Sequence, residues 1–467
     1  MSAIFSNEKV ANNHVLITNP LHTKENLFNI KGMKRKLYAK LLAWKTSKNR
    51  KPLVLRGARQ VGKTHLLKTF GKQEYDNCIY LNFEEDPKLS EFFSGKLKPS
   101  IILENLSAYL EKDIHAENTL IIFDEIQECP EALNSLKYFQ ENANEFHIVS
   151  AGSLLGVKLA NTKGFPVGKV NFLDLYPLSF FEFLEAIGKN KLQEFLMNIS
   201  EFNPIPEPLH EDLIMLLKKY MYIGGMPEAV MEYVETESLM GIKAIQKEIL
   251  DAYVLDFAKH APKDQIMKIT EVWESIPSQL AKENKKFIFS AIRQGARGRE
   301  YETAVQWLAD AGLIYKSYNI SVPKLPLLGY SNKNIFKIFL LDVGLLATMS
   351  NVSVKSVVEE RGLFSEFYGA FTENFVAQEL SQQHQSLYYW TSAGIAEVDF
   401  VIEQELDVYP LEVKAGVSTK KKSLVVFNEK YKPKTSLRTS LMNLKKDGNI
   451  TNIPLYFLGR LTKILVN

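Results

Sequence analysis

Residues 53–64 read LVLRGARQVGKT and are followed by HLLKTF at 65–70. The stretch begins with an apolar run, continues with the pattern G-x-x-x-x-G-K-[ST] and ends with a helix-compatible segment. This is the order of a strand, a phosphate loop and a helix. The glycines permit backbone angles that turn successive N–H groups inward, and the helix adds its positive N-terminal end. We predict that this segment binds the phosphates of ATP or GTP. The residues expected to contact the nucleotide are Gly57, Arg59, Gln60, Val61, Gly62, Lys63, Thr64 and His65.

Lys63 and Thr64 have different expected roles in the nucleotide site, and a second segment supplies its acidic residues. Lys63 reaches the phosphate oxygens, and the Thr64 hydroxyl is a ligand for Mg²⁺, a hard cation that takes small oxygen ligands. Residues 119–123, TLIIF, form an apolar run that ends in Asp124 and Glu125. We expect Asp124 to hold the Mg²⁺ shell through water and Glu125 to polarise the attacking water as general base. Alone, the two acids could merely cap a helix, but together with the phosphate loop they indicate nucleotide hydrolysis.

Further short apolar runs at 79–83 and 146–149 are separated by longer polar stretches. They predict buried parallel strands in an α/β sheet. The second run leads to Ser153, which could sense the γ-phosphate or the water from the ligand crevice, although serine is also an ordinary residue where strands end. Residues from about 179 to 255 have a mostly helical pattern, so we expect a helical lid on this sheet domain.

The composition restricts the class of protein that this chain can form. The chain has 467 residues, enough for about three domains, and its 46% hydrophobic and 24% charged residues exclude a disordered or fibrous protein. The net charge of +3 is too small to predict a polyanionic partner by itself. Because the chain has two cysteines and no signal segment, we expect a reducing, cytoplasmic location. No run approaches 18 apolar residues, so we expect no membrane partner.

Five segments, in order, resemble the AAA-type P-loop ATPases of bacteria and archaea. They are GARQVGKT at 57–64, FDEIQ at 123–127, AGSLL at 151–155, LYPLSF at 175–180 and GGMPE at 224–228. The resemblance implies ATP rather than GTP, because no Asn-Lys-x-Asp tetrapeptide that reads guanine is present in the sheet domain. It also implies a cation that faces the γ-phosphate. Many relatives carry an arginine just before the LYPLSF segment, where the nearby basic residue of this chain is Lys169.

The middle of the chain has the pattern of a winged helix. Helical stretches at about 266–280, 287–292 and 299–311 precede an alternating strand at 312–320. Three arginines gather at the start of the third helix, where such a module meets phosphates or a DNA groove; they are Arg293, Arg297 and Arg299. The alternative is a spacer or an oligomerisation surface.

Near the C-terminus, carboxylates and a lysine recur on neighbouring predicted elements. Glu373 lies in a helical stretch, Asp399 in the run EVDFVI, and Glu412 and Lys414 in LEVK. Because strand residues alternate faces, Glu412 and Lys414 project together, and a short connection at 403–410 brings Asp399 beside them. Asp399 and Glu412 suit one or two Mg²⁺ ions, and Lys414 can orient water or stabilise developing charge.

This order resembles the PD-(D/E)xK nuclease superfamily over roughly residues 335–467, and such a C-terminal partner commonly follows this ATPase type. The resemblance implies phosphodiester hydrolysis by Asp399, Glu412 and Lys414, with Glu373 as a further metal ligand. Two alternatives stay open. The motif could arise by chance in a pair of strands, or the fold could be inactive as a nuclease and only hold nucleic acid or a protein partner.

The positive charges are clustered. Nine basic residues and no acidic one lie between 31 and 51, in an expected amphipathic helix, and ten against one lie between 414 and 446. Either block could contact phosphates or could be an ordinary solvated face.

We therefore predict an α/β protein with a P-loop parallel sheet, a helical lid, a winged-helix-like connector and a restriction-endonuclease-like C-terminal domain. The expected divisions are an arm at 1–30, the ATPase at 31–260, the connector at 261–330 and the nuclease-like domain at 331–467. ATP hydrolysis would drive or license DNA engagement or cleavage. The alternative is a nucleotide-dependent switch or scaffold, a homo-oligomer included, whose nuclease-like domain is silent.

Overall fold

The computed structural model describes residues 33–153, 156–157, 168–199, 203–282, 285–355, 365–392, 396–416 and 422–466. The predicted arm at 1–30 lies outside these residues. Residues from Lys34 onward form one unit.

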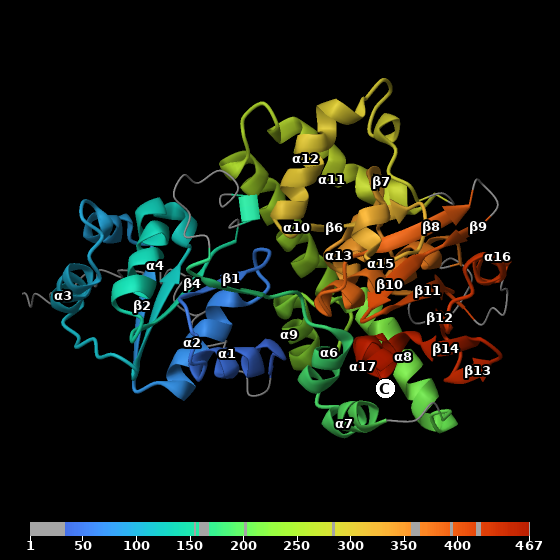
Figure 1. Cartoon of the computed structure of the whole chain (residues 1–467), viewed down its shortest axis with the longest axis horizontal. Coiled ribbons are helices and arrows are strands. Elements are labelled where there is room, and N and C mark those ends of the chain that lie inside the picture. The colour runs from blue at the N-terminus through green and yellow to red at the C-terminus, as the bar shows by residue number, and fades with distance from the viewer. Residues whose placement is uncertain are drawn as a thin grey trace, which may run out of the picture. The chain divides into compact units, whose positions relative to one another are not determined.

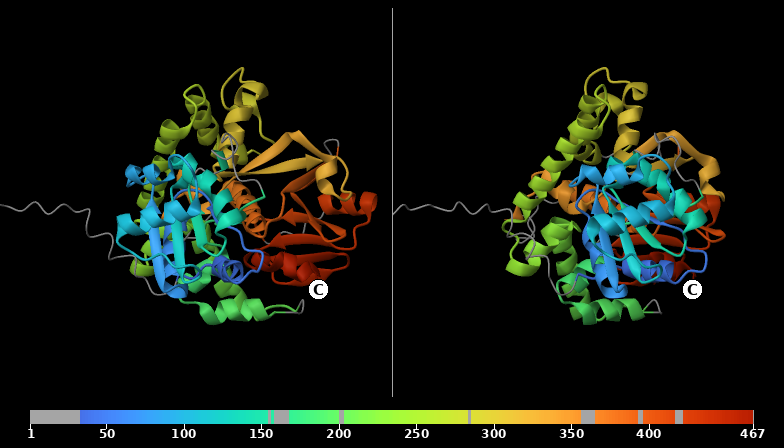
Figure 2. Two further views of the ribbon diagram at one scale, coloured as in Figure 1. Left: turned by 60° about the vertical axis from the view of Figure 1, so that its left-hand side comes forward. Right: turned by 90° about the vertical axis from the view of Figure 1, so that its left-hand side faces the viewer.

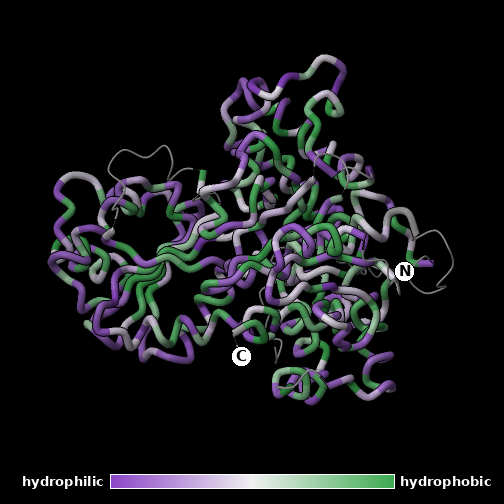
Figure 3. The backbone as a smooth tube through the Cα atoms, turned by 45° about the vertical axis from the view of Figure 1, so that its right-hand side comes forward, coloured by the Kyte–Doolittle hydropathy of each residue, from purple (hydrophilic) through white to green (hydrophobic). Residues whose placement is uncertain are grey.

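A five-stranded parallel sheet organises the N-terminal part of this unit (Figure 1). Its strand order is β2-β3-β4-β1-β5. The strands are β1 (Leu53–Arg56), β2 (Asn77–Asn82), β3 (Thr119–Asp124), β4 (His147–Ala151) and β5 (Asn171–Asp174). Residues 120–123 are fully buried, as expected for a strand covered on both faces. These central strands form a green, hydrophobic bundle in Figure 3. The predicted parallel α/β sheet is confirmed.

Helices surround this sheet. They are α1 (Leu37–Lys45), α2 (Lys63–Glu74), α3 (Pro99–Leu110) and α4 (Pro130–Asn142), with the 3₁₀ segments η2 (Pro87–Phe93) and η3 (Ile126–Glu128). A cluster of apolar side chains from β2, β3, η2, α3 and α4 fills the space between them. Aromatic rings of Phe83, Phe93 and Phe123 meet edge to face at the centre of this cluster.

A mostly helical region follows, in agreement with the predicted pattern. Its members are α6 (Phe180–Ala186), α7 (Asn190–Asn198), α8 (Glu207–Ile223), α9 (Pro227–Thr236) and α10 (Ile242–His260). The first helix begins at a capping box, in which Ser179 and Glu182 satisfy each other's backbone N–H groups. A tight Gly224–Gly225 turn separates α8 from α9. No helix among the residues that the structure describes is both long and apolar enough to span a membrane.

The connector joins the next sheet directly. It comprises α11 (Ile266–Leu280), η4 (Phe289–Ala291), α12 (Gly298–Asp310), β6 (Ile314–Ile320), η5 (Leu327–Tyr330) and β7 (Ser331–Leu340). Strands β6 and β7 pair antiparallel, and β6 also pairs with β8 (Tyr388–Ser392), which pairs with β9 (Ala396–Val398). The predicted boundary between residues 330 and 331 lies between β6 and β7, which pair with each other.

A second mixed sheet completes the chain, with the order β10-β11-β12-β14-β13. Its strands are β10 (Phe400–Gln404), β11 (Asp407–Val413), β12 (Ser436–Ser440), β13 (Lys445–Asp447) and β14 (Ile450–Pro454). The associated helices are α13 (Val343–Met349), α15 (Ser365–Gln382), α16 (Lys422–Tyr431), η6 (Leu455–Arg460) and α17 (Leu461–Val466). Figure 2 shows the strands of this C-terminal half side by side in orange and red. Strands β10 and β11 form a hairpin, and β12 lies parallel to β11.

Candidate functional site

The phosphate loop occupies the carboxyl end of β1 and has a conformation that its glycines allow. Gly57 has φ +151°, and a Cβ atom there would lie 2.2 Å from the carbonyl oxygen of Leu175. Gly62, at the start of α2, has φ +94°, and Gln60 adopts a left-handed φ of +64°. Such angles are accessible chiefly to glycine, so the loop geometry requires glycine at its two ends.

Lys63 is the first residue of α2, and its side chain folds back along the loop. Its Nζ donates to the carbonyl oxygens of Gly57 and Ala58, at 2.9 and 2.8 Å. Burial lowers the pKa of the Lys63 ammonium to about 8, against the opposing attraction of Glu125 and Asp124. The ammonium is thus held by two neutral oxygens inside the loop, where an anionic phosphate is a stronger partner.

The acidic pair Asp124 and Glu125 lies beside the start of α2. Thr64 Oγ1 donates to Asp124 Oδ2 at 2.6 Å, and the Tyr80 hydroxyl donates to the same oxygen at 2.9 Å. The Glu125 backbone N–H donates to Asp124 Oδ1 at 3.1 Å. The Thr64 hydroxyl and the Asp124 carboxylate are hard oxygen ligands in contact, so this pair fits Mg²⁺. Tyr80 was not predicted, because only the pairing of β2 with β3 brings it here.

The remaining predicted contacts are distributed around the loop. Gln127 Nε2 donates to Glu125 Oε2, which orients that carboxylate. His65 is exposed on α2. Ser153 is buried two residues after β4 and lines a pocket with Arg59.

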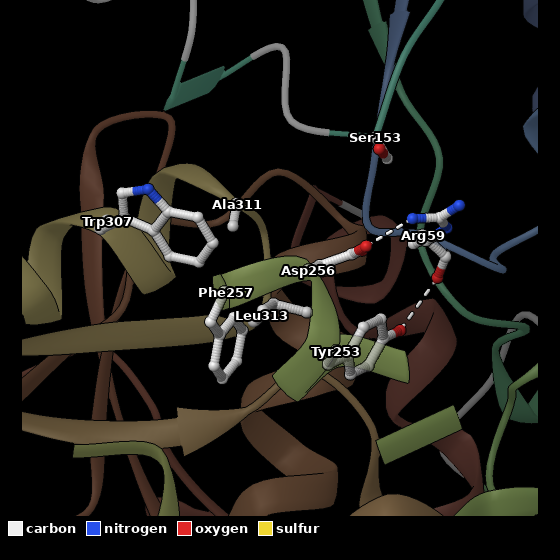
Figure 4. Close-up of a pocket in the computed structure, with 8 residues that line it drawn as sticks. All are labelled: Arg59, Ser153, Tyr253, Asp256, Phe257, Trp307, Ala311 and Leu313. Atoms are coloured by element: carbon white, nitrogen blue, oxygen red, sulfur yellow. Dashed lines mark hydrogen bonds and ion pairs between the residues drawn. The ribbon is translucent and has the colours of Figure 1, made fainter. Parts of the chain in front are cut away.

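That pocket connects the phosphate loop to α10 (Figure 4). Its volume is only about 10 Å³, and its lining is Arg59, Ser153, Tyr253, Asp256, Phe257, Trp307, Ala311 and Leu313. Arg59 Nη1 donates to Asp256 Oδ1, and the Tyr253 hydroxyl donates to the Arg59 carbonyl oxygen at 2.9 Å. Arg59 of the phosphate loop therefore contacts α10 of the helical region. Sequence reasoning missed Tyr253 and Asp256, which have no motif of their own.

Lys169 does not lie at the phosphate loop. It precedes β5, whose Asn171 pairs with Leu53 at the beginning of β1, whereas the loop follows the end of β1. Its Nζ instead pairs with Glu141 on α4 at 3.0 Å. Lys169 therefore lies toward the amino ends of β1 and β5, on the side of the sheet opposite the phosphate loop.

Arg35 is a cation from outside the loop that contacts it. Its Nη1 donates to the Val61 carbonyl at 3.0 Å, and its Nη2 donates to the Tyr176 carbonyl at 2.5 Å. Its Nε donates to Glu182 Oε1 at 3.1 Å. Arg35 thus ties the loop to the segment after β5 and to α6.

The C-terminal residues come from different elements and interact electrostatically. Glu373 belongs to α15, Asp399 lies between β9 and β10, and Glu412 lies in β11 just before Lys414. Asp399 Oδ2 accepts the Val413 backbone N–H at 2.7 Å, and Lys414 Nζ donates to Glu412 Oε1 at 2.5 Å. Burial raises the pKa of Asp399 well above its usual range, and the Glu373 and Glu412 carboxylates raise it further. The structure therefore brings the predicted carboxylates into one electrostatic neighbourhood.

Two lysines that sequence reasoning missed enter the same neighbourhood. Lys285 Nζ donates to Glu373 Oε1, and Lys337 Nζ lies 2.5 Å from Glu397 Oε1 and 3.7 Å from Glu373 Oε2. Burial opposes ionisation of Glu373, but Lys285 and Lys337 outweigh it and lower its pKa.

Among the residues that the structure describes, no donor hydrogen-bonds to two buried oxygens of this neighbourhood, Glu373 Oε2 and Glu412 Oε2. They are hard ligands of the kind that divalent cations prefer. Within the described ranges, however, no three His, Cys, Asp or Glu side chains are grouped closely enough to hold a metal ion as they stand.

Some residues of each basic block make contacts within the fold. In the first, Arg35 makes the contacts above, Lys45 Nζ donates to the Glu74 carbonyl, and Lys51 Nζ donates to the Gly168 carbonyl at 2.5 Å. In the second, Lys434 pairs with Asp407, and the buried Arg438 donates to Asn452. Lys31, Lys420 and Lys421 lie outside the described residues. Arg293, Arg297 and Arg299 of the connector are exposed, with Arg293 3.8 Å from Glu271.

Three family descriptions match successive parts of the chain. Residues 49–184 match the AAA domain, residues 214–356 match a domain of unknown function (DUF8612), and residues 368–458 match another (DUF4143). No curated protein matches the chain. The chain thus carries an AAA P-loop domain, as predicted, followed by two further domains that these descriptions leave without a function.

Several solved structures are distantly similar. The Walker-type ATPase PABY2304 of Pyrococcus abyssi is 15% identical, with 68% of this chain and 96% of that chain covered and a TM-score of 0.43. AMPPCP-bound DnaA from Aquifex aeolicus is 16% identical, with coverages of 62% and 92% and a TM-score of 0.28. The Aeropyrum pernix Orc1 protein in complex with DNA is 14% identical, with coverages of 73% and 94% and a TM-score of 0.28. Likeness at this level establishes no function for this chain.

Proposed function

We propose that the AAA domain hydrolyses ATP with Mg²⁺ and that hydrolysis controls the C-terminal domain. The 2.6 Å contact between Thr64 Oγ1 and Asp124 Oδ2, directly after Lys63, carries the first part. Mg²⁺ held by Thr64 and Asp124 would neutralise charge on the phosphates. Lys63 exchanges its loop carbonyls for phosphate oxygens, and Glu125, oriented by Gln127, accepts the proton of the attacking water.

Phosphate release from ATP tests this assignment. Lys63→Ala should lose turnover by at least about 100-fold, and Glu125→Gln should lose it comparably while still binding nucleotide. Lys72→Ala is the matched control, because Lys72 is an exposed lysine on the same helix. Turnover that persists unchanged in Lys63→Ala would exclude the phosphate-loop assignment.

For the C-terminal domain we favour metal-dependent hydrolysis of DNA phosphodiester bonds. The supporting arrangement is α15, the β10–β11 hairpin, α16 and then β12 parallel to β11. Glu373 lies on α15, Glu412 lies on β11, and Asp399 and Lys414 directly flank the hairpin. The unsatisfied buried oxygens of Glu373 and Glu412 support a cation there. A metal ion would supply Lewis-acid activation of the phosphate or water. Lys414, in contact with Glu412, is placed to orient a water molecule.

The connector is the proposed DNA contact. Its helices α11 and α12 and the β6–β7 hairpin follow in winged-helix order, and its three exposed arginines lie at the start of α12. Neutralising them should weaken DNA binding and flatten its salt dependence, since each phosphate contact releases counterions.

A silent C-terminal domain is the second candidate, favoured by a specific observation. Glu373 is already paired with Lys285 and lies near Lys337, which reduces its need for a metal ion. The protein would then be a nucleotide-dependent switch that holds a nucleic acid or protein partner.

Plasmid cleavage in Mg²⁺ or Mn²⁺, with and without ATP, separates the two candidates. A nuclease should cut, and Lys414→Ala and Asp399→Asn should each reduce cutting by about 100-fold or more. Lys446→Ala is the control, because this lysine is exposed on β13. Absence of cleavage under every nucleotide condition would favour the switch.

A further inference from the structure

Arg59 is the third residue of the phosphate loop, and carboxylates of other elements engage its side chain. Its Nη1 donates to Asp256 Oδ1 on α10, and its Nη2 lies 4.0 Å from Oε2 of Glu84, which follows β2. The Tyr253 hydroxyl, about one turn before Asp256 on the same helix, donates to the Arg59 carbonyl oxygen at 2.9 Å (Figure 4). Helix α10 therefore holds both the backbone and the guanidinium of one loop residue.

This ion pair lies within electrostatic reach of the phosphate-binding lysine. Burial lowers the pKa of the Lys63 ammonium, the Arg59 guanidinium lowers it further, and Asp256 opposes this effect. Ser153, which we expect to sense the γ-phosphate, lines the same small pocket as Arg59 and Asp256. A guanidinium presents a planar fork of N–H donors that suits two phosphate oxygens at once. The loop thus carries a phosphate-binding group next to the place where we expect the terminal phosphate.

On this basis, and resting on ATP binding at the phosphate loop, we propose that Arg59 distinguishes ATP from ADP by exchanging Asp256 for the γ-phosphate. The γ-phosphate carries more negative charge than a carboxylate and offers three oxygens, so it is the stronger partner for the guanidinium. ADP lacks this group and leaves the ion pair with Asp256 intact. Arg59 is therefore a specificity-determining residue, and the side-chain contact between the loop and α10 depends on which nucleotide is bound.

The exchange requires little rearrangement. The Arg59 side chain is 35% exposed, so it can turn without opening the core, and its carbonyl stays bound to Tyr253. Asp256 lines the pocket, where a water molecule can replace the guanidinium as its partner once the arginine has left. Only the side chain of the loop residue has to move.

Aromatic contacts extend from α10 into the connector. On α10, Phe257 meets Trp273 of α11 and Trp307 of α12 edge to face, with ring centroids 5.7 and 5.5 Å apart. Trp307 also lines the pocket beside Asp256. Release of Asp256 from Arg59 therefore changes the surroundings of a tryptophan in the connector, which provides an optical signal.

Affinities for ADP and for the β,γ-imido analogue of ATP, measured with Mg²⁺ on the full-length protein, test the exchange. Arg59→Met should bind the analogue about tenfold or more weakly than wild type, and ADP with less than about threefold change, because only the γ-phosphate contact is lost. Asp256→Asn should bind the analogue about threefold or more tightly, because the competing carboxylate is neutralised. In the double variant this gain should vanish, which assigns it to Arg59.

Two variants are matched controls. Arg56→Met removes another arginine–aspartate pair at the same end of β1, in which Arg56 Nε lies 2.8 Å from Asp174 Oδ1. Asp251→Asn neutralises an exposed acid on α10. Both variants should bind the two nucleotides like wild type.

The failures are distinguishable. No binding of either nucleotide to wild type would overturn the phosphate-loop assignment itself. With that binding intact, an unchanged ratio of the two affinities in Arg59→Met would overturn the role of Arg59 at the γ-phosphate, and so would the same loss of analogue affinity in Arg56→Met. Analogue binding that is unchanged or weaker in Asp256→Asn would show that the arginine does not leave Asp256.

Emission of Trp307, taken as the difference between wild type and Trp307→Phe, provides a readout that is independent of affinity. The analogue at saturation should shift this emission and ADP at saturation should not, and Arg59→Met should show no shift with either nucleotide. Equal emission with the analogue and with ADP in wild type would overturn the release of Asp256.

Discussion

Gly57 shows how strictly one residue fixes the phosphate loop. A Cβ atom would lie 2.2 Å from the backbone oxygen of Leu175, and φ is +151°. We expect Gly57→Ala to cost at least about 3 kcal/mol in stability, and to lose ATP binding, because neither backbone segment can yield. Gly329→Ala is the control, since a Cβ atom there meets nothing within 4 Å. It should change stability by less than about 0.5 kcal/mol. Equal melting temperatures for the two variants would contradict the steric argument.

Asp342 gives the protein a residue-level dependence on pH. This buried carboxylate begins α13, and it accepts backbone N–H groups of Gly225 at 2.6 Å and of Gly344 and Leu345 at 3.0 Å. Burial raises its pKa from 3.8 to about 6, against the effect of these three donors. A raised carboxyl pKa means that the folded state binds the proton more tightly. The contribution of this tighter proton binding to folding stability is therefore complete below pH 3.8, and it is lost as the pH rises through 6.

We therefore expect Asp342 to contribute about 1 to 2 kcal/mol less stability at pH 8 than at pH 5. Asp342→Asn should be destabilised at both pH values. An asparagine amide has one acceptor oxygen, so its NH₂ group would either face the Gly225 N–H or replace the oxygen that accepts from Gly344 and Leu345. The gap in melting temperature between wild type and Asp342→Asn should shrink from pH 5 to pH 8. A gap that stays constant would show that Asp342 does not titrate in this range.

At the scale of elements, the sequence predicted what is encoded locally. The phosphate loop and the acids after β3 are contiguous patterns next to apolar runs, so their strands and the sheet edge could be read directly. Lys285, Lys337 and Asp256 could not, because each acquires its partner across tens to hundreds of residues through tertiary packing. The strand pairing that crosses the predicted boundary at 330/331 could not be read from the sequence either. The pairing of β6 with β7 is visible only once both strands are placed.

The contact between the phosphate loop and α10 yields a prediction at this scale. Arg59 is 35% exposed and Asp256 9% exposed, so their ion pair is only partly screened. We expect Asp256→Ala and Arg59→Ala each to lower the melting temperature, and the double variant to lose less than the sum, with a coupling of about 1 kcal/mol. Asp251→Ala, an exposed acid on α10, is the control. Strict additivity of Arg59→Ala and Asp256→Ala would mean that the pair does not couple the loop to the helix.

Across the whole molecule, one segment contacts both the phosphate loop and α15, the helix that carries Glu373. The Leu175 carbonyl lies against Gly57, and the next residues lead to α6 beside α15. There the Phe180 N–H donates to Glu379 Oε1 at 3.0 Å, and Gln382 Nε2 donates to the Pro177 carbonyl at 3.1 Å. Because α15 also carries Glu373, a shift of this segment on nucleotide binding would be transmitted to the carboxylate site.

Such a connection predicts a reciprocal thermodynamic linkage. A saturating non-hydrolysable ATP analogue should change the Mn²⁺ affinity of the Glu373 site by about 5-fold or more, and Mn²⁺ should change the affinity for the analogue by the same factor. Calorimetric titration of each ligand with and without the other measures both factors, with Glu373→Gln used to subtract Mn²⁺ bound at the phosphate loop. Lys63→Ala, which should not retain the nucleotide, should show no linkage. Identical Mn²⁺ affinities with and without bound analogue in wild type would mean that the two sites act independently, since any differential contact between two states must appear in both binding equilibria.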